Sequence, residues 1–159
     1  AFLPTQTLSY PLVRSGERFP FLCPEAKGFC LPEPTTKEEK YASHLQGVAL
    51  VERLALDVLD SATKQRGVVV FATGTPSKSD AWTQLRADVT QRVYRRPQFP
   101  ESAFGSAILG AKHVFGNLET AVNALVKIEK VFEPRKELAG VYDELFSRFC
   151  RILEDRNYL

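Results

Sequence analysis

A short stretch rich in glycine and hydroxyl side chains offers the clearest chemistry in this chain. Gly74 can adopt backbone angles that a side chain forbids, and Ser77 or Ser79 can cap the first turn of a following helix. A helix N-terminus presents unpaired N–H donors and the positive end of the helix dipole, and therefore favours phosphate or another polar ligand group. We predict a ligand turn here, with free N–H groups facing a crevice. Many turns with the same residue types bind nothing, so the pattern alone leaves that alternative open.

The flanking residues predict a strand before this turn and a helix after it. The run Val68–Phe71 is apolar without alternation, which is typical of a central parallel strand covered on both faces. From about residue 80 to 91, Trp82, Leu85 and Val89 recur on one helical face. A strand that runs into such a turn and then a helix is the layout with which α/β proteins hold a nucleotide.

The rest of the chain also alternates strands and helices, as in a layered α/β lobe. The further expected elements are strands at residues 7–12, 19–22 and 92–95, and helices at residues 41–63, 100–115 and 118–126 and after Pro134. The first of these helices is apolar nearly all round in its middle, so we expect it to be buried against a sheet. In the second, Ala103, Ala107 and Ala111 are expected to let the helix approach the sheet or a ligand closely, and Gly116 to end it. In the last helix the expected buried stripe is Leu138, Val141, Leu145, Phe149 and Ile152.

The bulk composition indicates one globular domain and few special partners. The 159 residues suffice for a core, and 44% hydrophobic and 25% charged residues are ordinary values. A net charge of +2 is too small for a general affinity for nucleic acid or membranes. No apolar run reaches the roughly 20 residues of a membrane span. We interpret the cluster Arg86, Arg92, Arg95 and Arg96 as a solvated edge.

The cysteines and histidines suggest neither a disulfide framework nor a metal site. Cys23 and Cys30 could in principle pair, whereas Cys150 is expected in the core, and a reduced, cytoplasmic setting is favoured. His44 and His113 lack metal-ligand spacing, and His44 is interpreted as a surface or packing residue.

No acidic residue is nominated as a catalytic base. The aspartates interpreted as helix-surface or first-turn carboxylates are Asp57, Asp60, Asp80 and Asp88. The chain contains no methionine, so we expect Ala1 not to be a translation start and the chain to be a processed product or a piece of something longer.

Two common nucleotide motifs do not fit the turn. A P-loop has glycine before its lysine, but Ser77 precedes Lys78, and Ala72 stands where the first glycine belongs. The GxGxxG fingerprint is also absent after Gly74.

Five blocks in a fixed order, over nearly the whole chain, carry a resemblance to a known family. The blocks are residues 16–21 (GERFPF), 41–53 with LQG at 45–47, 73–89 (TGTPSKSDAW, then Q and ADV), 97–107 with PESAFGSA, and 132–145 with FEP and YDEL. They resemble the C-terminal domain of FGGY-family carbohydrate kinases, where the third block reads approximately SGGGxxSxxWxQxxADV, the fourth PExxAxGAA, and LEG is usual for LQG. An unrelated α/β domain with a chance likeness is the competing interpretation.

The resemblance implies a fold, a domain and a nucleotide site. The implied fold is an actin-like, ribonuclease-H-like ATPase lobe, an α/β structure with a mixed sheet and packed helices. Residues 1–159 would be the C-terminal nucleotide-binding lobe, and the N-terminal sugar-binding lobe of the same protein would be its missing partner. The residues carried over as nucleotide-binding are Gly74, Thr75, Pro76, Ser77 and Ser79. The helix with Ala103, Gly105 and Ala107 would back the pocket.

The implied activity is transfer of a phosphoryl group from ATP, with Mg²⁺, to a sugar or polyol hydroxyl. The isolated chain is expected to be inactive because the family's base lies in the other lobe. Thr75 and Pro76 replace glycines and remove one N–H donor, so a degenerate, non-catalytic nucleotide-binding or interaction module is the alternative. Pentuloses, hexuloses and polyols stay open as substrates, and GERFPF favours a ketopentose. A homodimer is also left open.

Overall fold

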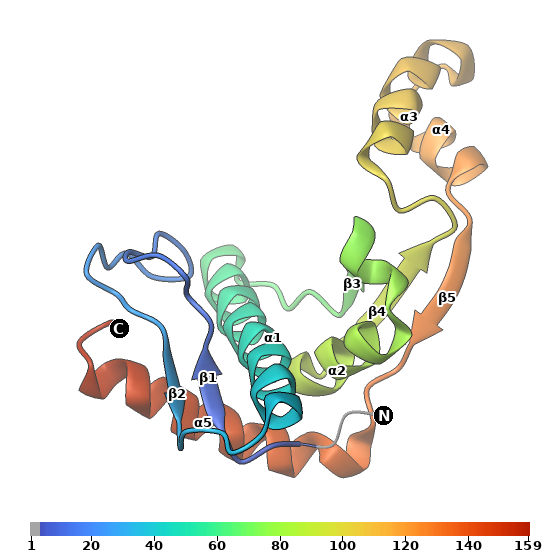
Figure 1. Cartoon of the computed structure of the whole chain (residues 1–159). Coiled ribbons are helices and arrows are strands. Elements are labelled where there is room, and N and C mark those ends of the chain that lie inside the picture. Colours follow the sequence, from blue (N-terminus) through green and yellow to red (C-terminus); the bar gives the residue numbers. More distant parts are fainter. Residues whose placement is uncertain (1–3) are drawn as a thin grey trace.

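The structure, a computed structural model, describes residues 4–159, so the expectation about Ala1 lies outside the described residues (Figure 1). In chain order the elements are β1 (Leu8–Tyr10), β2 (Phe29–Leu31), α1 (Lys37–Thr63), β3 (Val69–Phe71), a 3₁₀ turn (Thr75–Lys78), α2 (Asp80–Thr90), β4 (Val93–Pro97), α3 (Ser102–Phe115), α4 (Leu118–Leu125), β5 (Ile128–Phe132), a second 3₁₀ turn (Lys136–Leu138) and α5 (Ala139–Asp155). The helices near residues 41–63, 80–91, 100–115 and 118–126 are thereby confirmed, as is the long terminal helix.

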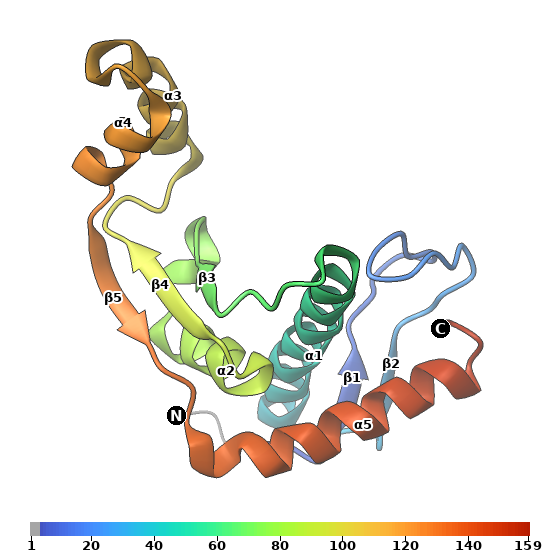
Figure 2. The ribbon, with the colours of Figure 1, turned by 180° about the vertical axis from the view of Figure 1, so that it is seen from behind.

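The elements form a broad base and a projecting arm. α5 runs beneath α1 and the antiparallel pair of β1 and β2, while β4 and β5 lead away from α2 towards α3 and α4 (Figures 1 and 2). The arm carries α3 and α4 at its far end, away from α1. The turn that follows β3 lies on the inner side of this arm.

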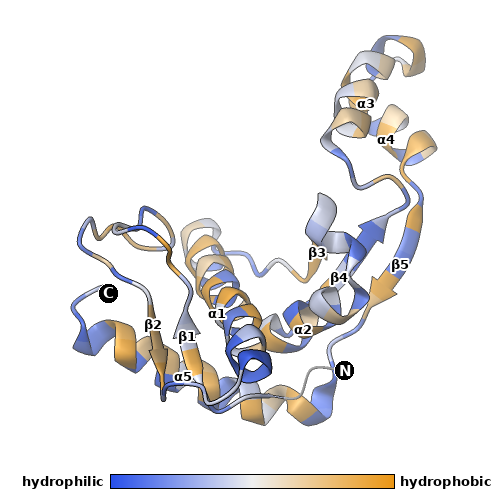
Figure 3. Ribbon diagram, viewed as in Figure 1, coloured by the Kyte–Doolittle hydropathy of each residue, from blue (hydrophilic) through white to orange (hydrophobic). Residues whose placement is uncertain are grey.

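The main core lies where α1, α2 and α5 meet β1. Tyr10, Leu50, Leu85 and Phe149 are among its buried side chains. The colouring of α5 alternates between hydrophobic and hydrophilic along its length, as expected for a helix with one buried face (Figure 3). Its buried residues are Tyr142, Leu145, Phe149 and Leu153. The expected stripe is therefore right at Leu145 and Phe149, Leu138 and Ile152 pack partly buried against the core, and Val141 is exposed.

A glycine and a glutamine in the LQG block fix α1 against the N-terminal segment. A Cβ on Gly47 would lie 2.0 Å from the Ser9 carbonyl oxygen, so α1 can approach β1 this closely only with glycine there. The Gln46 amide accepts the Thr5 N–H at 3.0 Å and donates to the Thr5 carbonyl at 2.8 Å. A glutamate could not make the second bond, which gives the Glu-to-Gln difference from the family pattern a structural role.

The second sheet is mixed, with strand order β3-β4-β5. β3 and β4 are parallel, and β5 is antiparallel to β4. Among the described residues β3 is therefore an edge strand, with Phe71 54% exposed and Val68, just before the strand, 65% exposed. The prediction of a central strand covered on both faces is wrong for this chain, because β4 takes the central place.

Several expectations about packing are wrong. α1 packs against β1 of the first sheet as expected, but it is not buried all round, since Tyr41, Val48 and Leu59 are exposed. α3 packs on α4 and not on the sheet, and open space surrounds Gly105 and Gly110. Residues 19–22 form a turn closed by a bridge between Glu17 and Cys23, and β1 pairs instead with β2, which the sequence did not reveal. β5 was also missed.

The charged residues are more buried than expected. Arg92 and Arg96 are 4% and 7% exposed and Arg86 is half-buried, so the prediction of a solvated edge holds only for Arg95. Asp88 is fully buried and bonded to Arg135, so it is not a helix-surface carboxylate. These side chains tie α2 and β4 to neighbouring segments.

The cysteines and His44 have structural environments without special chemistry. Cys23, Cys30 and Cys150 are free thiols, so the 23–30 pair does not form. The His44 ring contacts the Ser9 hydroxyl at 3.1 Å, which confirms a packing role. Across residues 4–159, the structure contains no helix long and apolar enough to cross a membrane and no cluster of three or more His, Cys, Asp or Glu suited to a metal ion.

Candidate functional site

Two turns meet at one edge of the β3-β4-β5 sheet. Because β3 and β4 are parallel, their carboxyl ends lie side by side, and the turns that follow them lead into α2 and α3. The Gly74 N–H donates to the Pro100 carbonyl at 2.7 Å, which joins the two turns directly. In open α/β sheets, ligands bind at this end of the strands.

The first turn has the local structure that its residues predict. Gly74 has a φ of +78°, which favours glycine, and Thr75–Lys78 form a 3₁₀ turn with Pro76 near its start. The Ser79 hydroxyl caps α2 by accepting the Trp82 N–H at 3.3 Å.

Two of the N–H groups expected to face a crevice are used inside the turn. The Gly74 N–H goes to Pro100, and the Ser77 N–H donates to the Gly74 carbonyl at 3.1 Å. Ser77 is fully buried, and its hydroxyl donates to the same carbonyl at 2.7 Å. The Ser77 side chain therefore holds the turn together and does not face a ligand.

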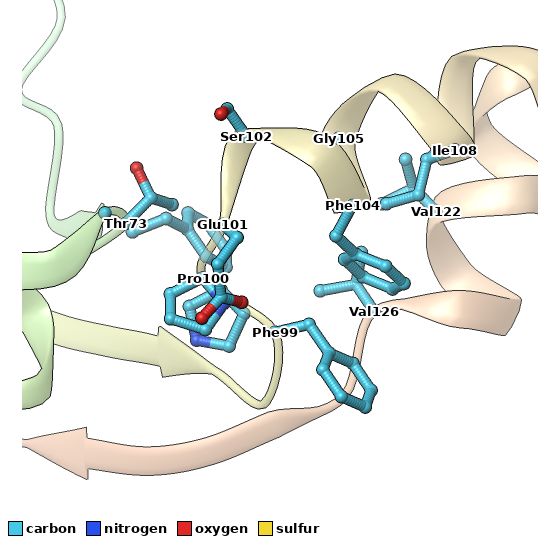
Figure 4. Close-up of a pocket in the computed structure, with 13 residues that line it drawn as sticks. Thr73, Phe99, Pro100, Glu101, Ser102, Phe104, Gly105, Ile108, Val122 and Val126 are labelled. Atoms are coloured by element: carbon cyan, nitrogen blue, oxygen red, sulfur yellow. The ribbon is translucent and has the colours of Figure 1, made fainter.

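A cleft of about 540 Å³ opens beside this turn (Figure 4). Its lining residues are Phe71, Thr73, Gly74, Pro97, Phe99, Pro100, Glu101, Ser102, Phe104, Gly105, Ile108, Val122 and Val126. Figure 4 shows Phe104 and Ile108 of α3 turned towards Val122 and Val126 at α4. The Phe99 ring lies 5.2 Å from that of Phe104, centroid to centroid. The apolar wall and a few polar groups suit a flat, largely apolar ring with polar substituents.

Only some of the residues that the family resemblance implied for the nucleotide site line the cleft. Gly74 and Gly105 line it, whereas Thr75, Pro76 and Ser79 are exposed on the turn outside the lining. Ala103 and Ala107 are not among the lining residues either.

Sequence reasoning missed most of the apolar wall. Phe99 and Phe104 flank the PES block, and two aromatic residues around a strand-to-helix turn could have signalled a ring-binding wall. Val122 and Val126 carried no such signal, because they reach the cleft only through the packing of α4 on α3.

Ion pairs border the cleft on its polar side. Lys78 and Glu101 pair at 2.8 Å, with both side chains half-exposed. The hydrogen bond from Lys78, with a second from the Glu101 backbone N–H, holds the pKa of the Glu101 carboxyl below its usual value. An exposed pair of this kind contributes little stability, so Lys78 can exchange its partner for another anion.

A second hollow of about 320 Å³ lies at this pair and shares Phe99, Pro100 and Glu101 with the cleft. Its other lining residues are Lys78, Arg96, Gln98 and Glu129. Arg96 also donates to Asp80, which lies outside this lining, and bonds from Lys130 and then Arg96 hold the pKa of the Asp80 carboxyl below its usual value. The Glu101 and Asp80 carboxylates are thus paired with cations, and their lowered pKa values make them poor proton acceptors.

The structure is an α/β lobe with a mixed sheet, and it has the actin-like ATPase fold. The sequence profile of the FGGY family of carbohydrate kinases, C-terminal domain, matches residues 1–114. The chain therefore belongs to the FGGY family of carbohydrate kinases and carries its C-terminal domain.

Individual relatives agree with this assignment. The chain is 29% identical over 119 residues to a xylulose kinase of Staphylococcus epidermidis, a match that covers 70% of this chain and 24% of the relative. It is 28% identical over 123 residues to the human FGGY carbohydrate kinase domain-containing protein, covering 75% and 22%. The chain thus spans about a quarter of the length of these curated relatives.

Solved structures show the same fold. A ligand-bound xylulose kinase of Lactobacillus acidophilus superposes with a TM-score of 0.80 at 25% identity, covering 94% of this chain and 31% of that one. A glycerol kinase of Plasmodium falciparum solved with ADP gives a TM-score of 0.70 at 16% identity, covering 91% and 30%. The second likeness shows the fold alone.

Proposed function

We propose that this chain is the ATP-binding lobe of a kinase that phosphorylates a hydroxyl of a sugar or polyol with Mg-ATP. The observation that carries the proposal is the apolar cleft of about 540 Å³ at the carboxyl ends of β3 and β4, next to Gly74. The family membership supplies the reaction class. An N-terminal lobe of the same protein is the proposed partner, and the cytoplasm the proposed location.

The apolar wall and the polar turn of the cleft suit different parts of a nucleotide. We assign the adenine to the apolar wall at Phe99 and Phe104, and the ribose and phosphates to the turn at Gly74, Thr75, Pro76 and Ser79. Ser77 is buried and is assigned no nucleotide contact; its hydroxyl stabilises the turn by donating to the Gly74 carbonyl. We assign a phosphate contact to Lys78, which is half-exposed and paired with Glu101 of the cleft lining.

The described residues do not provide a magnesium site by themselves. Asp80 and Glu101, the carboxylates beside the turn, are paired with lysine and arginine. Mg²⁺ is therefore assigned no ligand in this chain. In phosphoryl transfer the ion neutralises charge that develops on the phosphates.

A ketopentose is the proposed sugar. Relatives at 28 to 29% identity include xylulose kinases, which agrees with the preference that the GERFPF block indicates. The sugar-binding contacts are assigned to the partner lobe.

A non-catalytic nucleotide-binding module is the second candidate. The observation in its favour is that Pro76 has no N–H to donate and that the Gly74 and Ser77 N–H groups are already bonded. Sugar-dependent release of ADP by the full-length protein separates the two candidates, because a non-catalytic module releases none.

Two glycines of α3 provide a matched test of the cleft. Gly105 lines it and Gly110 does not, yet a Cβ at either position would meet no atom within 4 Å. Gly105→Phe is expected to fill the cleft and to abolish stabilisation by Mg-ATP in a thermal-shift titration of the full-length protein. Gly110→Phe should keep it, because stabilisation follows RT ln(1 + [L]/Kd) and only the first variant changes Kd.

Neither substitution should unfold the helix, since phenylalanine is a better helix former than glycine. Equal nucleotide stabilisation of both variants would place the nucleotide outside this cleft. Absence of any effect of millimolar Mg-ATP on the unsubstituted protein would reject the proposed function itself.

A further inference from the structure

A buried arginine, Arg96, donates to the turn that follows β3 but does not line the 540 Å³ cleft. Arg96, on β4, is 7% exposed. Its Nη1 donates to the Ser77 carbonyl and to Asp80 Oδ1, both at 2.8 Å, and its Nε donates to Glu129 Oε2 at 2.8 Å. A buried guanidinium is costly unless it is paired and hydrogen-bonded, and these three acceptors meet that requirement.

The acceptors belong to three different segments. Ser77 lies in the turn after β3, Asp80 is the first residue of α2, and Glu129 lies on β5. Asp80 also accepts from Lys130 at 2.6 Å, so the pairing continues along β5. One side chain thus connects the turn to the helix it precedes and to the strand that returns from α4.

A chain of hydrogen bonds leads from Arg96 to the wall of the cleft. Arg96 holds the Ser77 carbonyl, and the Ser77 hydroxyl and N–H both hold the Gly74 carbonyl. The Gly74 N–H in turn holds the Pro100 carbonyl. Gly74 and Pro100 line the cleft from opposite turns, so their separation depends on a sequence of bonds that begins at Arg96.

We propose that Arg96 is a positioning residue that pre-arranges the turn at Gly74 for the nucleotide. This inference rests on the proposed function and deepens it, because it says how the turn is ordered for the nucleotide where Thr75 and Pro76 replace the glycines of the family pattern. A turn with Thr75 and Pro76 cannot adapt its backbone to a ligand as a run of glycines can. It therefore has to be held in the binding geometry before the ligand arrives, which reduces the cost of ordering on binding.

Arg92, just before the same strand, provides a matched control. It is 4% exposed, it donates to Asp60 Oδ2 at 2.7 Å and to the Gly67 carbonyl, and it lies just before the other end of β4. Both arginines are thus buried, and each donates hydrogen bonds to one backbone carbonyl and at least one aspartate. Only Arg96 is linked to the turn at Gly74.

The test compares Arg96→Lys with Arg92→Lys in the full-length protein. Lysine keeps the charge but cannot reproduce the planar set of donors. If the competent fraction of the turn falls to about a tenth, the apparent Kd for Mg-ATP rises about tenfold. We expect Arg96→Lys to raise the KM for ATP by that factor, with the KM for the sugar and kcat within about twofold, and Arg92→Lys to change none of them.

A second readout does not require a nucleotide. Native-state hydrogen exchange of the Gly74 and Ser77 amides should accelerate about tenfold in Arg96→Lys and stay unchanged in Arg92→Lys. Ser77→Ala removes the hydrogen bond from the Ser77 hydroxyl to the Gly74 carbonyl and leaves the Arg96 guanidinium in place. It should also accelerate hydrogen exchange at Gly74 and raise the KM for ATP. This variant keeps the test informative if Arg96→Lys fails to fold.

The possible outcomes separate the two proposals. Unchanged exchange at Gly74 and Ser77 in both Arg96→Lys and Ser77→Ala would overturn the positioning role. Accelerated exchange with an unchanged KM for ATP would show that Arg96 holds the turn only structurally, and would also overturn it. Accelerated exchange in a protein whose unsubstituted form binds no Mg-ATP would reject the proposed function instead.

Discussion

At the scale of single residues, Pro76 is the position where this chain departs most clearly from the glycine-rich pattern of its family. It lies near the start of a 3₁₀ turn, where its fixed φ fits and its missing N–H removes a possible donor to a ligand. Pro76→Gly should restore the donor and raise the affinity for Mg-ATP. The free energy of unfolding should fall by about 0.4 to 1 kcal/mol, because the unfolded chain gains conformational freedom. Isothermal titration and urea unfolding measure the two effects.

Pro34→Gly is the control for that change, since Pro34 lies in the segment between β2 and α1. It should lose similar stability and leave the affinity for Mg-ATP unchanged. An unaltered affinity in Pro76→Gly would mean that the lost N–H does not limit nucleotide binding. The non-catalytic candidate would then lose the observation that favours it.

At the scale of elements, the ion pair of Asp88 and Arg135 joins α2 to the segment before α5. Asp88 is fully buried and accepts from the Arg135 N–H at 2.8 Å, Nε at 3.0 Å and Nη2 at 2.6 Å. Asp88→Ala should cost about 3 to 5 kcal/mol in the free energy of unfolding, because it leaves a guanidinium without its partner. Arg135 is 31% exposed and can partly rehydrate, which places the expectation at the lower end of that range.

Asp143 and Arg53 form the matched exposed pair, at 2.7 Å with the aspartate 57% exposed. Asp143→Ala should cost no more than about 1 kcal/mol, as for other surface pairs. Urea unfolding of both variants measures the difference. Equal losses would show that burial adds nothing to the Asp88 pair and that α2 is held mainly by its apolar face.

The same elements show what the sequence could and could not predict. Helices were located correctly because their signals are local, such as the Ser79 cap and the spacing of Trp82, Leu85 and Val89. β2 and β5 were missed because three and five residues carry little periodicity, and β5 includes Glu129 and Lys130. The burial of Asp88 and Arg96 was missed because charged residues are usually exposed. Arg135 lies 47 residues from Asp88, and the acceptors of Arg96 lie 16, 19 and 33 residues away, beyond the reach of local patterns.

The candidate site was predictable to a similar extent. Gly74 and the Ser79 cap follow from residue type, because the positive φ and the helix start are local requirements. The apolar wall depends on how α4 folds back on α3, which no motif describes. The turn was therefore found, whereas most of the cleft that it borders was not.

At the scale of the whole molecule, the two carboxylates Glu101 and Asp80, near the proposed nucleotide cleft, do not suit a base for phosphoryl transfer. A general base works best with a pKa near the operating pH. Beside the cleft, bonds from Lys78 and from the Glu101 backbone N–H lower the pKa of Glu101, and bonds from Lys130 and Arg96 lower that of Asp80. Both carboxylates are poor proton acceptors at neutral pH. We therefore expect the 159-residue chain alone to release no ADP in the presence of Mg-ATP and any ketopentose or polyol, and the full-length protein to release it with one of them.

A coupled assay for ADP over a panel of ketopentoses, hexuloses and polyols measures this difference. Addition of a separately produced N-terminal lobe to the chain should restore part of the activity, because the exposed β3 edge and the cleft mouth remain accessible to it. Glu101→Gln in the full-length protein is the internal control. It should leave kcat within about threefold if Glu101 is not the base, whereas loss of a general base lowers the rate by roughly 10²- to 10⁴-fold. Sugar-dependent turnover by the chain alone would show that one of its own carboxylates takes the proton after all.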